Sequence, residues 1–145
     1  MKFYIGTDHA GVELKDATVV MLQKKGHEVV DLGPFSHDRV DYPDYAIKVS
    51  QSVLSDSASQ GILICGSGIG MSMAANRFKG IRAALCHDAY TAQMARRHND
   101  ANILCFGERV VGHGVAESII DAWIAATFEG GRHSGRIEKI EAIEG

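Results

Sequence analysis

The chain has 145 residues, of which 46% are hydrophobic and 23% are charged, and its net charge is −3. This length and composition predict a globular protein with a buried core, and the negative charge argues against a general nucleic-acid binder. No apolar run approaches the roughly 20 residues of a membrane span, and the first residues lack the features of a secretory signal.

Short apolar runs alternate with amphipathic stretches along the chain. The runs typical of strands are residues 3–7, 27–32, 61–65, 81–86 and 102–106. Helical spacing of apolar residues occurs at 12–25, 45–54, 68–77, 89–98 and 113–128. Residues 33–43 form a polar loop, and the tail from residue 130 starts loosely and ends in a short charged helix.

This alternation predicts βαβ units. We therefore expect an α/β fold in which residues 1–145 form a single domain, with a doubly wound, Rossmann-like sheet of five parallel strands and helices on both faces. The three cysteines are widely spaced and form no CxxC pair. Free thiols of this kind are typical of the reducing cytoplasm, which is the expected location.

The stretch GILICGSGIG at 61–70 is the most informative part of the sequence. It places Cys65 at the carboxyl end of a buried strand, directly before a glycine loop that leads into a helix. Ligands bind at this end of the strands in α/β sheets, and exposed N–H groups of a glycine loop hold anions. The thiol beside the loop indicates a base or nucleophile acting on an anionic substrate.

Other glycine loops fit these residues less well. The dinucleotide fingerprint requires a third glycine where this chain has Met71, although Asp88 stands about 20 residues further on, where a ribose-binding acid occurs. A Walker loop needs a lysine that is absent here, and a cysteine phosphatase would need an arginine at position 71. From the loop alone, a second interpretation is a tight strand-to-helix turn that has no function.

Five motifs together give a more specific indication, because they occur in a fixed order along nearly the whole chain. The motifs are GTDHAG (6–11), DYPDYA (41–46), GILICGSGIG (61–70), ARRHNDANILCFGERVVG (95–112) and EGGRHSGR (129–136). With them, the sequence resembles ribose-5-phosphate isomerases of type B, whose superfamily includes isomerases of six-carbon sugar phosphates.

The resemblance implies interconversion of ribose 5-phosphate and ribulose 5-phosphate through an enediolate. It implies that Cys65 is the base that moves a proton between C1 and C2. The backbone N–H groups that would form the anion hole belong to Gly66, Ser67, Gly68, Ile69 and Gly70. Some relatives use a glutamate just past this loop as the base, but this chain has Met71 there and matches the cysteine version.

The resemblance also implies roles for individual residues outside the glycine loop. His98 is implied as the ring-opening acid and base, and Asn99 as a donor to a sugar hydroxyl or to the developing oxyanion. Asp8 and His9 end the first strand, so they are expected at the ligand-binding edge. There Asp8 would bind sugar hydroxyls and assist ring opening, and His9 would reach the ring or the phosphate. Tyr42 would line the sugar pocket, although a packing role fits it equally well.

The resemblance assigns the phosphate to three arginines, namely Arg109, Arg132 and Arg136. It also implies a dimer or tetramer with sites shared between subunits, in which the tail at 129–145 docks at a subunit interface. We expect no cofactor, metal site, nucleic acid or membrane partner. The alternatives are a six-carbon sugar-phosphate isomerase of the same family and a non-catalytic module that binds a nucleotide or phosphate.

Three other residues have simple structural interpretations. Cys86 and Cys105 end apolar strands without a glycine loop, so we expect them to be buried in the core. Asp88 follows the fourth predicted strand and is expected to cap the next helix.

Overall fold

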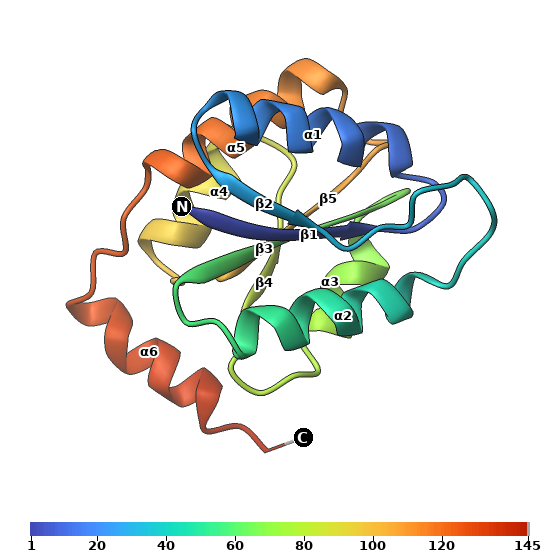
Figure 1. Ribbon diagram of the computed structural model, residues 1–145. Helices are drawn as coiled ribbons and strands as arrows, with labels where there is room; N and C mark the ends of the chain where they lie inside the picture. The colour runs from blue at the N-terminus through green and yellow to red at the C-terminus, as the bar shows by residue number, and fades with distance from the viewer. Residues whose placement is uncertain (145) are drawn as a thin grey trace.

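The computed structural model describes residues 1–144 and contains a sheet of five parallel strands in the order β2-β1-β3-β5-β4 (Figure 1). The strands are β1 (Lys2–Thr7), β2 (Glu28–Asp31), β3 (Ser59–Cys65), β4 (Ala83–Leu85) and β5 (Ile103–Gly107). The chain moves to one side from β1 to β2, and then crosses to the other side of β1, where β3, β5 and β4 lie in that order. The carboxyl ends of β1 and β3 therefore border a topological switch point, where ligands bind in such sheets.

Helices cover both faces of this sheet, which confirms the predicted doubly wound fold (Figure 1). One face carries α1 (Val12–Lys24), α4 (Ala89–Arg97) and α5 (His113–Ala125). The other face carries α2 (Tyr42–Leu54) and α3 (Ile69–Ala75). Along β3, Ile62 and Ile64 pack with the first group of helices, and Leu63 and Cys65 pack with the second. This alternation follows from the two-residue period of a strand.

Several helix boundaries differ from those predicted. The helix expected at 45–54 begins at Tyr42, because Pro43 fits the first turn of a helix, where its missing N–H is not needed. The helix expected at 68–77 ends at Ala75, because the side chain of Asn76 pairs with both backbone groups of Ala83 on β4. Asp88 caps α4 by accepting from the N–H of Thr91, as predicted.

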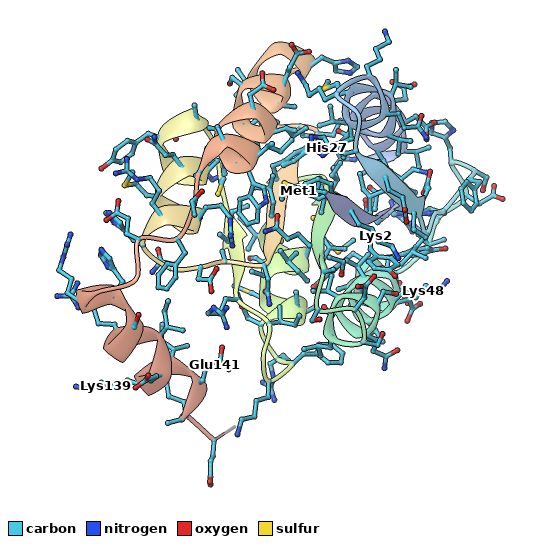
Figure 2. All side chains as sticks on the ribbon, turned by 60° about the vertical axis from the view of Figure 1, so that its left-hand side comes forward. Met1, Lys2, His27, Lys48, Lys139 and Glu141 are labelled. Atoms are coloured by element: carbon cyan, nitrogen blue, oxygen red, sulfur yellow. The ribbon has the colours of Figure 1, made fainter. Side chains whose placement is uncertain are left out.

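The tail forms a sixth helix, α6 (Arg132–Glu141), which lies outside both hydrophobic cores. Just before the helix, Glu129 forms an ion pair with Arg97 at 2.7 Å, and its N–H donates to the Arg97 carbonyl. At the far end of the helix, Glu141 pairs with Arg82. Figure 2 shows Glu141 pointing toward the body of the molecule and Lys139 pointing away from it. Polar contacts at its two ends thus hold α6 to the domain.

Among residues 1–144, no helix combines the length and apolar character that crossing a bilayer requires.

A buried lysine fixes the start of the loop between β2 and α2. Lys15 is fully buried on α1, and its Nζ donates to both carboxylate oxygens of Asp31, at 3.0 and 2.8 Å, and to the carbonyl of Pro34. Asp16 lies 3.2 Å from the same Nζ, but its side chain is 65% exposed. A buried ammonium needs a close partner, so Asp31 is the carboxylate on which Lys15 depends.

We expect Asp31→Ala to lower the free energy of unfolding by about 3 kcal/mol, because it leaves a buried charge without its main partner. The matched control is Asp16→Ala, which removes an exposed partner and should cost less than about 1 kcal/mol. Urea unfolding of both variants measures the difference. Equal losses would show that Asp31 has no special role.

Candidate active site

The predicted residues at the carboxyl ends of β1, β3 and β5 form one open depression of about 580 Å³. Its volume is in the range of small-molecule sites. Met73 and Val110, which sequence reasoning missed, also line it. The predicted residues among its lining are Asp8, His9, Tyr42, Cys65, Gly66, Ser67, Ile69, Gly70 and Arg109.

The glycine loop fixes the direction of the Cys65 thiol at this depression. The N–H of Gly68 donates to Cys65 Sγ at 3.1 Å. Gly68 has a φ of 82°, and a Cβ there would lie 2.8 Å from the backbone of Phe106, so only glycine fits this position. The N–H of Ile69 donates to Ser67 Oγ at 3.2 Å. Two of the five predicted anion-hole donors are therefore engaged within the loop itself.

Two large side chains flank the loop. The backbone N–H of Arg109 donates to the carbonyl of Gly66, and a Cβ on Gly66 would lie 3.4 Å from Arg109 Nη1. On the other side, a Cβ on Gly70 would lie 2.4 Å from the ring of Tyr42. The guanidinium and the phenol thus stand directly against the loop. They bring a positive charge and a hydroxyl to the thiol side of the depression.

The turn after β1 supplies the remaining wall. Asp8 is mostly buried, and its Oδ1 accepts from the N–H of Ala10 at 2.9 Å. His9 Nδ1 lies 3.2 Å from both the nitrogen and the carbonyl oxygen of Val40, which holds the ring against the loop that precedes α2. The prediction that Asp8 and His9 share an edge with Cys65 is confirmed.

The other predicted residues lie elsewhere in the same chain. His98 caps the end of α4, and its ring stacks on His133 with centroids 4.3 Å apart and planes at 14°. Asn99 lines a separate cavity between β4 and the end of α6. Arg132 and Arg136 are exposed on successive turns of α6.

The residues around Cys65 and those around His98 lie at opposite ends of β5. Cys65 pairs with Gly107 at the carboxyl end of β5, whereas His98 and Asn99 come shortly before Ile103 at its amino end. Figure 1 shows α6 on the side where the strands begin, away from the loop after β3. A strand of this length spans roughly 15 Å. One chain therefore does not bring His98 or the arginines of α6 to Cys65.

Three residues near His98 were not predicted from sequence. Arg82 donates to the backbone carbonyls of Asn99 and Asp100 at 2.9–3.2 Å, which braces a turn in which Asp100 has a φ of 45°. Glu129 and His133 both lie against the His98 ring. The spacing of Glu129 and His133, one helical turn apart, was the only sequence signal for this group.

Burial and charge perturb several titratable groups. Burial raises the pKa of Cys86 to about 11 and raises the pKa of Cys105 well above its ordinary value. Both are buried in the core, as predicted. Burial, reinforced by the positive charge of Arg132, lowers the pKa of His133.

The doubly wound sheet, with a thiol and a glycine loop at its switch point, is typical of α/β enzymes that act on small anionic molecules. Comparison with known proteins identifies the particular family. Residues 3–140 match the ribose/galactose isomerase family, and the chain belongs to that family.

Close relatives cover nearly the whole chain. Ribose-5-phosphate isomerase B of Escherichia coli is 51% identical over 143 residues, which are 99% of this chain and 96% of the relative. The ribose-5-phosphate isomerase B of Clostridium thermocellum has a solved structure with a TM-score of 0.95 and 51% identity, covering 97% of this chain and 95% of that one. The Mycoplasma genitalium protein, solved with ribulose 5-phosphate bound, has a TM-score of 0.93 and 44% identity, covering 97% and 93% of the two chains.

The thiols should differ sharply in reactivity. Cys65 borders the depression, whereas Cys86 and Cys105 have raised pKa values and hold few thiolates at pH 8. We expect iodoacetamide at pH 8 to alkylate Cys65 at least about tenfold faster than either other cysteine. Peptide mass spectrometry over a time course measures the three rates. Equal labelling of Cys86 would contradict the assigned environments.

Proposed function

We propose that the protein is an aldose–ketose isomerase that interconverts D-ribose 5-phosphate and D-ribulose 5-phosphate. The observation that carries this proposal is the Cys65 thiol, which the Gly68 N–H directs at a depression also bordered by Asp8 and Arg109. Membership of the ribose/galactose isomerase family supports the reaction class. The name of the Escherichia coli relative and the ligand of the Mycoplasma genitalium protein support the five-carbon substrate.

The reaction needs only proton transfers on the opened sugar. Cys65, as a thiolate, takes the proton from C2 of the aldose, and the electron pair moves through C1 onto the carbonyl oxygen to give an enediolate. The thiol then returns the proton to C1, while the C2 hydroxyl passes its own proton to the C1 oxygen and becomes the ketone, which completes the isomerisation. In this proposal the N–H groups of Gly66, Ser67 and Gly70 stabilise the enediolate, since those of Gly68 and Ile69 already have partners.

Side chains along the other walls of the depression bind the sugar hydroxyls and the phosphate. Asp8 accepts hydrogen bonds from sugar hydroxyls and assists ring opening, while His9 contacts the ring or the phosphate. Tyr42 closes the side of the sugar pocket beside Gly70. Arg109 supplies the first cation for the phosphate, because a guanidinium matches phosphate oxygens with paired donors.

A second copy of the chain supplies the missing groups in our proposal. Ring opening needs the partner subunit's His98 and the partner subunit's Asn99, and the phosphate needs the partner subunit's Arg132 and the partner subunit's Arg136. The exposed arginines and the position of α6 outside both cores support this arrangement. The tail at 129–145 then docks across the interface of a homodimer, or of a tetramer built from two such dimers. The buried free thiols suit a cytoplasmic location.

A six-carbon sugar phosphate is the second candidate substrate, because the family name includes galactose isomerases. A module that only binds a nucleotide or phosphate is the third, and the family membership argues against it.

Replacing Cys65 with alanine should lower kcat by at least about 1000-fold, because it removes the group that carries the proton. A coupled assay with five- and six-carbon sugar phosphates measures the loss and also ranks the substrates. The matched control is Cys86→Ala, which removes a thiol outside the depression and should keep most of the activity. Circular dichroism should show both variants folded. An active Cys65→Ala protein would overturn the proposed base.

A further inference from the structure

Glu108 connects segments that border the Cys65 depression but are far apart in the sequence. It directly follows β5, and its backbone N–H donates to the carbonyl of Cys65 at 2.9 Å. Its half-buried side chain reaches α1, where Oε1 accepts from the backbone N–H of Leu14 at 2.7 Å. One residue thus holds the end of β3 through its backbone and the start of α1 through its carboxylate.

The start of α1 needs this carboxylate because it has no cap of its own. The N-cap residue is Gly11, which has no side chain to accept from the first N–H groups of the helix. A Cβ at Gly11 would clash with Thr7 and lie 2.7 Å from Ile64 Cγ2, so a capping serine or aspartate does not fit there. Leu14 is the third residue of α1, and its N–H is one that an N-cap side chain usually satisfies. Glu108 takes over that role from the end of β5.

The turn that leads into α1 carries two of the predicted site residues, Asp8 and His9. Its first part is fixed to β3, because the N–H of Asp8 donates to the carbonyl of Ile64 at 3.3 Å. Its last part is fixed to the helix start, because the N–H of Gly11 donates to the carbonyl of Asp8 at 3.2 Å. An uncapped first turn of α1 would loosen this second attachment. The cap on α1 therefore also restrains the turn that borders the depression.

We propose that Glu108 is a positioning residue of the active site, which rests on the proposed function. Its neighbour Arg109, whose N–H donates to the carbonyl of Gly66 at 3.0 Å, supplies the cation for the phosphate. The turn with Asp8 and His9 supplies the groups for the sugar. Glu108 ties these two parts together, so that the sugar and the phosphate of one substrate meet their partners at the same time. Displacements of about 1 Å between such groups lower rates by up to roughly a hundredfold.

Two substitutions at this position test whether the hydrogen bond to Leu14 matters. Glu108→Ala removes the bond and should lower kcat/KM for ribose 5-phosphate by roughly tenfold. Glu108→Gln keeps an oxygen that accepts from the same N–H, so it should retain at least about half of the wild-type kcat/KM. Equal losses in the two variants would overturn a role that acts through this hydrogen bond.

The matched control is Asp88→Ala, which removes the same kind of cap from another helix. Asp88 accepts from the N–H of Thr91, the third residue of α4, also at 2.7 Å, and α4 follows the edge strand β4. Asp88→Ala and Glu108→Ala should each lower Tm by roughly 3 °C. In assays well below both melting temperatures, only Glu108→Ala should lose activity. An equal loss of activity in Asp88→Ala would show a general effect of stability and would overturn the positioning role.

Amide hydrogen exchange tests the contact without relying on activity. The amides of Gly11 and Leu14 should exchange at least about tenfold faster in Glu108→Ala than in the wild type, and at nearly the wild-type rate in Glu108→Gln. Unchanged exchange in Glu108→Ala, or faster exchange with full activity, would overturn the positioning role. Faster exchange in a protein whose wild type has no isomerase activity would retain the cap and reject the proposed function.

Discussion

The parallel direction of the strands is the constraint on which the rest of the structure depends. Every strand delivers its carboxyl end to one edge of the sheet, and every crossover helix returns the chain to the other edge. Cys65 therefore stands at one edge, with Asp8 and Arg109 beside it. His98, at the end of a returning helix, stands at the opposite edge. A reaction that needs both residues at one substrate requires two chains, whose two-fold pairing would bring opposite edges together.

The polar contacts around the sheet hold the side chains of the site in position. The Gly68 N–H directs the Cys65 sulfur, and Lys15 anchors the loop that leads toward His9 and Tyr42. At the other edge, Arg82 ties the turn after His98 to Glu141 at the end of α6. The turn after His98 and the helix that carries Arg132 and Arg136 are thus tied to each other through Arg82.

Much of the site at the first edge could be predicted because its signal is local in the sequence. Cys65 and its glycines are contiguous, and Asp8 follows a strand directly, so the parallel fold alone places them together. Helix boundaries were less predictable, since the end of α3 depends on Asn76 reaching β4, a contact between separate elements.

The contacts around His98, at the opposite edge of the sheet, could not be predicted either, because they also join elements that are separate in the sequence. Glu129 and His133 share a helical spacing, but nothing in the sequence places them against His98. Arg82 had no signal at all, because its role consists of hydrogen bonds to backbone carbonyls, which any residues could supply. The resemblance named His98 and the arginines of α6 as site residues, and the fold then showed how far from Cys65 they lie.

The most direct test of this account is complementation between two inactive variants. Cys65→Ala and His98→Asn proteins are each purified, mixed in equal amounts, unfolded, refolded together and assayed with ribose 5-phosphate. In a mixed dimer, one site combines the two substitutions and the other is intact, so random pairing should restore about a quarter of the wild-type activity. Refolding each variant alone is the control. If the mixture stays as inactive as its components, each site lies within one chain and the account is wrong.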